Sequence, residues 1–193
     1  MLKTIKSLKK ILLVGLLIAS PLFAIDEAHI NSEMKTKIQE ITSILQNKNL
    51  SSAEKQAQMF PSIDTVFDYK TMSKIALGSY WKTLTTSQQN NFSYKFETKL
   101  KNSYFEKLEL YTNEKVLVKE LEKVKSTRIH LHTDIVGIED TYEIIYKFYK
   151  VQNSNDWLIY DIDITGVSII QTYRKQFSEF LATKSFNELL ASL

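Results

Sequence analysis

Residues 157–164 alternate between two sets of side chains, and this period of two predicts a β-strand. One set is apolar and the other is mixed: Leu158, Tyr160, Ile162 and Ile164 against Trp157, Ile159, Asp161 and Asp163. After Gly166 the apolar residues recur every three or four positions as far as Leu181, which predicts a helix. A single glycine between a strand and a helix can mark a junction that is simply packed in the core. It can also allow a turn at positive φ or a close approach of the backbone to a ligand. The pattern alone leaves both interpretations open.

Three earlier segments alternate in the same way, at residues 115–124, 127–136 and 142–148. Since short connections join these consecutive strands, we expect the four to pair as an antiparallel meander. The alternation does not determine which face of the sheet is concave. A shift of one residue would exchange the two faces of a strand.

The chain before the strands has a helical pattern. The spacing of apolar residues predicts helices at residues 30–45, 51–60, 69–81 and 86–111, and a last short helix follows Ser185. Pro61 is expected to end the second helix, and Gly78 to interrupt or end the third. Helix starts are indicated by Asp68 and by three capping boxes: Ser51 with Glu54, Thr85 with Gln88, and Ser185 with Glu188. The fold class is therefore α+β, a twisted antiparallel sheet of about four strands packed against N-terminal helices and a C-terminal helix.

The first 24 residues have the layout of a secretory signal peptide. Four lysines precede an apolar run from Ile11 to Ala19, which is shorter than the ~20 residues that span a bilayer, and Ser20-Pro21 precedes Ala24. We expect cleavage after Ala24, export to the periplasm and one domain over residues 25–193; an uncleaved anchor is the alternative. Because the chain has no cysteine, lipid attachment to cysteine, disulfides and thiolate catalysis are excluded.

Charge and glycine content exclude two further classes. The chain has 25 basic and 22 acidic residues, and the first 24 residues hold four lysines and no acid, so the mature part keeps 21 basic against 22 acidic. A near-neutral domain lacks the basic surface that nucleic acid requires. Only three glycines remain after the signal peptide, too few for a nucleotide-binding loop.

Two polar constellations could carry chemistry. His130, His132 and Asp134 share one face of a strand and could approach a metal, although a solvent-facing polar row is the simpler interpretation. Asp161 could be a carboxylate base in an apolar pocket, or it could hold structural hydrogen bonds. No nucleophile elbow accompanies a serine. We therefore predict no catalytic residue, no metal site and no cofactor.

Two separated motifs carry a resemblance to a known family. Residues 160–168, YDIDITGVS, are followed by Tyr173-Arg174 and Gln176-Phe177; earlier come Phe67-Asp68-Tyr69, IALGSYW at 75–81, and Leu84-Thr85 with Gln88. In this order they resemble the MlaC family, over about residues 60–193. The resemblance implies a periplasmic carrier that holds phospholipid acyl chains in an apolar cavity. It implies as partners an inner-membrane ABC transporter complex with its periplasmic substrate-binding subunit, and an outer-membrane lipoprotein complex, with phospholipid as cargo.

We predict the cavity wall from apolar residues of the strands, of the long helix and the helix before it, and of the corner after Gly166. The candidate lipid-binding residues are Leu77, Trp81, Phe92, Phe96, Leu100, Val116, Val118, Ile129, Leu131, Ile144, Tyr146, Phe148 and Val167. Arg174 could contact a lipid phosphate, or form a structural salt bridge. Two other classes stay open: a small-molecule enzyme that uses Asp161 or His130, and a structural adaptor whose interior has no room for ligand.

Overall fold

The structure is a computed structural model that describes residues 25–109, 114–137 and 140–193. Its helices are η1 (Glu27–His29), α1 (Ile30–Gln46), α2 (Ser52–Asp64), α3 (Tyr69–Leu77), η2 (Gly78–Thr83), α4 (Thr86–Leu108), α5 (Ile169–Leu181) and α6 (Phe186–Ser192). Its strands are β1 (Ile25–Asp26), β2 (Lys115–Lys125), β3 (Arg128–Val136), β4 (Thr141–Lys150), β5 (Asp156–Ile164) and β6 (Val167–Ser168).

The predicted signal peptide, residues 1–24, lies outside the described residues. Within the described part, no helix combines the length and the hydropathy that a membrane span needs.

The helices begin where the capping residues predict. All three capping boxes form, and the side chain of Asp68 accepts a hydrogen bond of 2.8 Å from the backbone N–H of Thr71. The predicted end of α2 is wrong, because the helix continues to Asp64 with Pro61 inside it. Pro61 lies in the last turn, where its missing N–H costs only one helical hydrogen bond. Gly78 ends α3 at φ 57°.

The sheet is antiparallel, with strand order β1-β5-β4-β3-β2 and β6 paired to β5. The α+β prediction is confirmed: the four long strands form the expected meander. Two short strands, β1 and β6, are added at the β5 side. The chain turns back at Thr165 and Gly166, with φ 49° and 82°, so β6 precedes the helix that the sequence predicts directly after the glycine. Gly166 supplies the positive φ expected of it.

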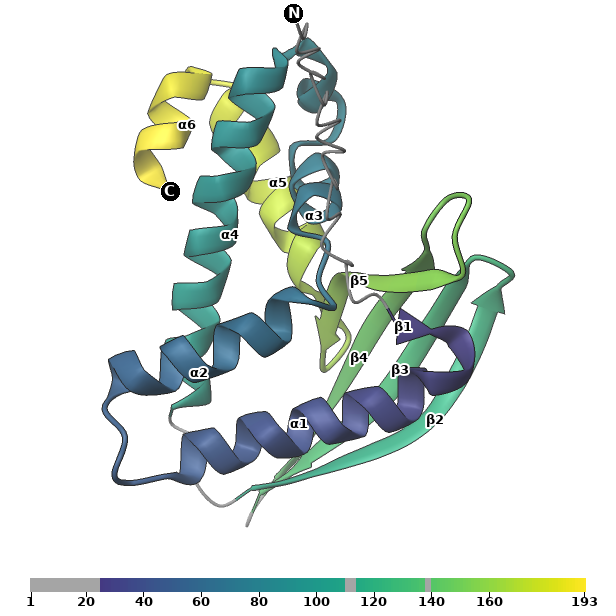
Figure 1. Cartoon of the computed structure of the whole chain (residues 1–193). Coiled ribbons are helices and arrows are strands. Elements are labelled where there is room, and N and C mark those ends of the chain that lie inside the picture. Colours follow the sequence, from purple (N-terminus) through teal and green to yellow (C-terminus); the bar gives the residue numbers. More distant parts are fainter. Residues whose placement is uncertain (1–24, 110–113, 138–139) are drawn as a thin grey trace, which may run out of the picture.

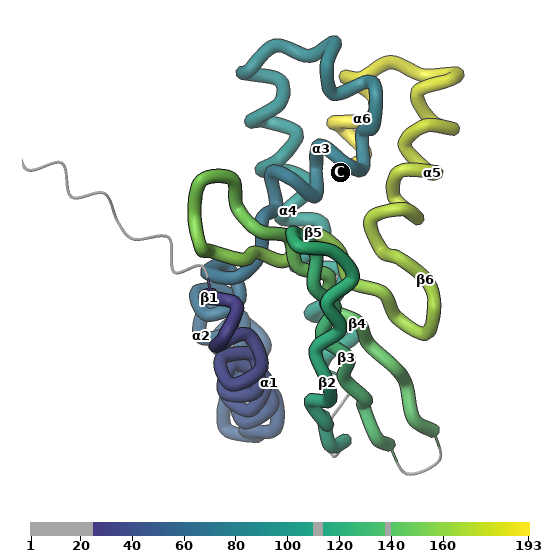
Figure 2. The backbone as a smooth tube through the Cα atoms, turned by 90° about the vertical axis from the view of Figure 1, so that its right-hand side faces the viewer, coloured from purple at the N-terminus to yellow at the C-terminus, as the bar shows by residue number. Residues whose placement is uncertain are grey.

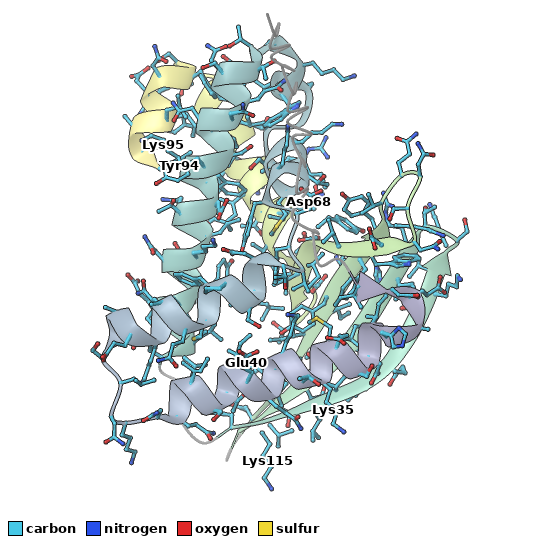
Figure 3. All side chains as sticks on the ribbon, in the orientation of Figure 1. Lys35, Glu40, Asp68, Tyr94, Lys95 and Lys115 are labelled. Carbon is cyan, nitrogen blue, oxygen red and sulfur yellow. The ribbon has the colours of Figure 1, made fainter. Side chains whose placement is uncertain are left out.

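The helices form two groups around the sheet. Helices α3, α4, α5 and α6 make an upright bundle at one end, α1 crosses in front of the strands, and α2 crosses the lower part of α4 (Figure 1). The side view places α1 and α2 on one face of the sheet, which we call the inner face (Figure 2). Asp68 lies where the bundle meets the sheet, and its backbone N–H donates to the carbonyl of Ile159 on β5 (Figure 3).

Three hydrophobic cores hold these parts together. The bundle core contains Phe92, Phe96 and Phe177; the second joins the N-terminal part of α1 to the inner face of the sheet; the third joins Leu45, Met59 and Phe105 from α1, α2 and α4. Because α1 contributes to the sheet core at one end and to the third core at its other end, it does not seal the whole sheet. A space remains between the three cores.

Candidate functional site

A cavity of about 810 Å³ occupies that space. Its walls come from α1, α2, the C-terminal half of α4, the start of α5, and one end of the inner face of the sheet. The volume lies within the usual range for ligand sites, ~300–1,000 Å³, and the lining is mostly apolar, as such sites are. The fold therefore provides a concave apolar site of ligand size.

The sheet contributes alternate residues from four strands, as the period of two requires. The inner-face residues at the cavity are Val116, Ile135, Tyr142, Ile144, Tyr146, Ile162 and Ile164. All belong to one end of the strands, where β2 and β4 begin and β3 and β5 end. Toward the other end, α1 packs directly on the sheet and the same face becomes solid core.

The helices complete the wall with one apolar stripe each. Helix α1 contributes Met34, Ile38, Ile41 and Leu45, α2 contributes Met59, Phe60 and Ile63, and α4 contributes Leu100, Tyr104, Phe105 and Leu108. The spacing of three and four along α1 and α4 places these side chains on one helix face. The stripe of α1 is visible in the sequence, but nothing in its period shows that it borders a cavity.

Five of the thirteen predicted wall residues line this cavity, namely Leu100, Val116, Ile144, Tyr146 and Val167. Four lie in the bundle core instead: Leu77, Trp81, Phe92 and Phe96. The last four pack between α1 and the sheet: Val118, Ile129, Leu131 and Phe148. The predicted strand residues all lie on the inner face, but these last four are covered by α1. The residues of α1 and α2 are missed because nothing in their apolar spacing shows that these helices border a cavity.

Two lysines on the wall fasten α2 to its neighbours. The ammonium of Lys37 donates to the carbonyl of Ser62 and the hydroxyl of Thr65, at 3.2 and 3.0 Å, at the C-terminal end of α2. Lys101 on α4 contacts Asp64 at 2.7 Å and Glu97 at 2.5 Å. Burial lowers the pKa of Lys101, but these two carboxylates outweigh it and raise the pKa above its usual value. Both cations are thus occupied in holding the cavity wall.

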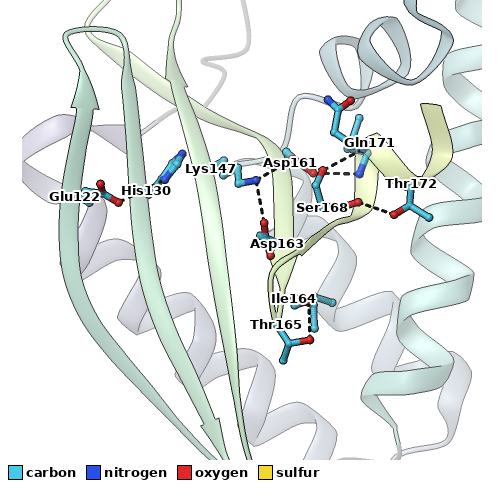
Figure 4. A network of polar contacts seen from close by, with 11 residues as sticks. Glu122, His130, Lys147, Asp161, Asp163, Ile164, Thr165, Ser168, Gln171 and Thr172 are labelled. Carbon is cyan, nitrogen blue, oxygen red and sulfur yellow. Dashed lines mark hydrogen bonds and ion pairs between the residues drawn. The ribbon is translucent and has the colours of Figure 1, made fainter. Parts of the chain in front are cut away.

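Asp161 lies in a structural network outside this wall (Figure 4). Its carboxylate accepts hydrogen bonds from the hydroxyl of Ser168 at 2.6 Å and the backbone N–H of Ile170 at 3.1 Å, both at the start of α5. It also accepts from the ammonium of Lys147 at 3.4 Å, which reaches Asp163 at 3.2 Å. These contacts fit the structural interpretation of Asp161, because its oxygens face donors of the fold.

The polar row of β3 pairs with glutamates. His132 contacts Glu122 at 3.2 Å and Glu143 at 3.1 Å. His130 approaches Glu122 at 3.6 Å (Figure 4). Burial is the largest effect on both imidazoles and acts to lower the pKa. The pKa of His130 is lowered accordingly, whereas the hydrogen bonds of His132 with Glu143 and Glu122 outweigh burial and raise its pKa. Asp134 pairs with Lys119. Among the described residues, no group of three or more potential ligands could hold a metal ion.

Arg174 lies on α5, exposed and outside the cavity lining. Its guanidinium covers Gly78, where an added Cβ would lie 3.2 Å from Nε. In the described part of the chain it forms no ion pair, so the structural salt bridge has no partner there, and the contact with a lipid phosphate stays a prediction.

We expect Arg174→Ala to change bound phospholipid less than twofold, because the side chain is exposed and does not border the cavity. The measurement is lipid phosphorus per protein after purification, with the unchanged protein prepared in parallel. A loss of most of the lipid at an unchanged melting temperature would assign Arg174 to the headgroup.

Comparison with known proteins places the chain among lipid-binding relatives. The family model described as "MlaC protein" matches residues 35–193. The intermembrane phospholipid transport system binding protein MlaC of Haemophilus influenzae is 25% identical over 120 residues, which covers 61% of this chain. The match spans 56% of the length of that relative. The phospholipid-binding protein from Ralstonia solanacearum, solved with a phospholipid, has a TM-score of 0.67 at 22% identity and covers 79% of this chain and 87% of its own. This structural similarity supports the fold.

Proposed function

Because this chain belongs to the MlaC family, we propose that it is a binding protein of intermembrane phospholipid transport that carries lipid with its acyl chains inside the cavity. The observation that carries the proposal is the apolar cavity of about 810 Å³ between the three cores. The relatives are described as a phospholipid transport binding protein and a phospholipid-binding protein, which agrees with such a cargo.

The energetics define what the cavity must supply. Moving a chain of about 16 carbons from a bilayer into water costs on the order of 12 kcal/mol, at ~0.8 kcal/mol per methylene. Walls such as Ile38, Ile144 and Ile162 replace the bilayer as apolar surroundings and offset this cost. A lipid in such a site is about as stable as in a membrane, so the direction of transfer has to come from partner complexes.

We propose the partners and compartment that the family resemblance implies. The carrier would act in the periplasm, receive or deliver lipid at an inner-membrane ABC transporter with its substrate-binding subunit, and exchange it with an outer-membrane lipoprotein complex. Residues 1–24 would direct export as a cleaved signal peptide, and residues 25–193 would act as one lipid-binding domain.

The two alternative classes find less support. An enzyme that uses Asp161 would need that carboxylate to face a substrate, whereas it is 4% exposed and accepts hydrogen bonds from Ser168 and Ile170. A non-binding adaptor would need a filled interior, and the cavity argues against that. The carrier is the function that the geometry supports best.

The test is denaturing mass spectrometry of an organic extract of the purified protein. We expect phospholipid at close to one molecule per chain, recovered again after delipidation and incubation with phospholipid vesicles. An unrelated exported protein purified by the same route is the control for carry-over. A protein that stays free of phospholipid in both preparations would overturn the proposal.

A further inference from the structure

The wall of the cavity contains a tyrosine hydroxyl on the sheet that has no hydrogen-bond partner among the described residues. Tyr146 lies in the middle of β4 and pairs in register with Leu131 on β3 and Ile162 on β5. Its side chain is on the inner face and lines the cavity. In the described part of the chain its hydroxyl makes no hydrogen bond. A polar O–H group is thus placed in an apolar wall without an acceptor.

Among the other hydroxyls nearby, that of Tyr104 on α4 also makes no hydrogen bond within the described residues, whereas three others have partners. Thr133, on the inner face of the next strand, donates to the carbonyl of Ile144 at 2.9 Å. Tyr69, also on the cavity wall, donates to Asp64 at 3.2 Å, and Tyr173 is bonded to Ser103. The hydroxyl of Tyr146 therefore faces the cavity and is free to donate to an acceptor on a bound ligand, which would satisfy a polar group that stands in an apolar wall.

The surroundings of Tyr146 define what that acceptor can be. The same strand places Ile144 and Phe148 on the same face, two residues before and after it. Burial raises the pKa of Tyr146 to about 12, so the phenol is neutral and remains a donor at any physiological pH. The apolar neighbours favour a neutral, weakly hydrated acceptor on a largely apolar ligand, because a charged group would lose its hydration there.

A phospholipid has one such group between its charged head and its chains, the carbonyl oxygen of each acyl ester. The methylenes of the chain cannot accept a hydrogen bond, and a phosphate would have to lose its hydration among apolar side chains. We propose that the hydroxyl of Tyr146 donates a hydrogen bond to an ester carbonyl of the bound lipid and so selects acyl esters over ether-linked chains. This inference rests on the proposed function and specifies the ligand of the same cavity.

The experiment compares two lipids that differ only in this acceptor. Delipidated protein is incubated with vesicles that contain equal amounts of dipalmitoyl phosphatidylcholine and its dihexadecyl ether analogue, and the bound ratio is measured by mass spectrometry. The original chain should favour the diester roughly three- to tenfold, the value of one hydrogen bond. Tyr146→Phe keeps the ring and should bring the ratio close to one.

Tyr69→Phe is the matched control, because it removes the same atom from a tyrosine of the cavity wall whose hydroxyl already has an acceptor within the fold, Asp64. It should keep the preference for the diester. The two lipids can leave the vesicle at different rates. This difference cancels when the ratio of bound diester to bound diether for each variant is divided by the same ratio for the original chain. An original chain without preference, or a Tyr146→Phe variant that keeps it, overturns the inference while lipid binding stands.

Two further outcomes separate this inference from the proposed function. If the original chain binds neither lipid, the proposed function fails, and the role of Tyr146 fails with it. If Tyr146→Phe does not fold, the infrared C=O band of carbonyl-labelled diester bound to the original chain decides. A shift to lower wavenumber than in vesicles supports the hydrogen bond, and an unshifted band overturns it.

Discussion

Replacement of Ile144 by tryptophan is expected to remove at least nine-tenths of the bound phospholipid and to leave the melting temperature nearly unchanged. Ile144 is half-buried because its side chain borders the cavity, so the larger indole can enter space that lipid would otherwise occupy. Overpacking of a filled core usually costs ~1–3 kcal/mol. Here the added ring meets a void, and the loss should fall on the ligand instead of the fold.

Leu131→Trp is the matched control, since Leu131 lies on the same face of the neighbouring strand but is fully buried between α1 and the sheet. It should lower the free energy of unfolding by ~1–3 kcal/mol, which corresponds to a fall in melting temperature of roughly 2–4 °C per kcal/mol for a domain of this size. Lipid content and melting temperature are measured on both variants. If Ile144→Trp unfolds to the same extent as Leu131→Trp, position 144 is core and the cavity is misplaced.

Replacement of Asp161 by alanine is expected to lower the free energy of unfolding by about 3 kcal/mol or more. The carboxylate is 4% exposed and holds the start of α5 to β5 through Ser168 and Ile170, and it shares the charge of Lys147. Without it, buried donors at the start of α5 lose their acceptor. Urea unfolding should show a lower midpoint at an unchanged slope.

Asp163→Ala is the comparison, because Asp163 accepts from the same lysine but has no role at the helix start. Its second oxygen is buried and has no hydrogen-bond partner among the described residues. Its removal should cost about 1 kcal/mol. Equal unfolding midpoints for the two variants would show that the contacts of Asp161 with α5 contribute no more than the shared ion pair.

The two expected results differ in kind, which makes them useful together. Ile144→Trp should separate lipid binding from stability, whereas Asp161→Ala should reduce both, since α5 carries part of the cavity wall at Ile169 and Tyr173. A protein in which every variant loses lipid only as it loses stability would not have a preformed cavity.

Local features of the sequence determined the elements and their order. The capping boxes begin helices where they occur, because the capping bonds are made within four residues. The period of two gave the four long strands, and the meander follows from the short connections. Gly166 gave the turn at positive φ, although the strand β6 that follows it was not apparent, since a two-residue pairing leaves no pattern.

Only the tertiary structure decided which apolar residues border the cavity. Ile144 and Phe148 have the same side-chain periodicity and lie on the same face of β4, yet one lines the cavity and the other is in solid core. The difference is the path of α1: Ile30 and Met34 belong to its core with the sheet, and Leu45 packs with Met59 and Phe105 of α2 and α4. Periodicity records which side of an element is apolar, but it does not record how far away the opposing element lies. That distance depends on contacts between segments far apart in the chain, and it is what separates a cavity from a core.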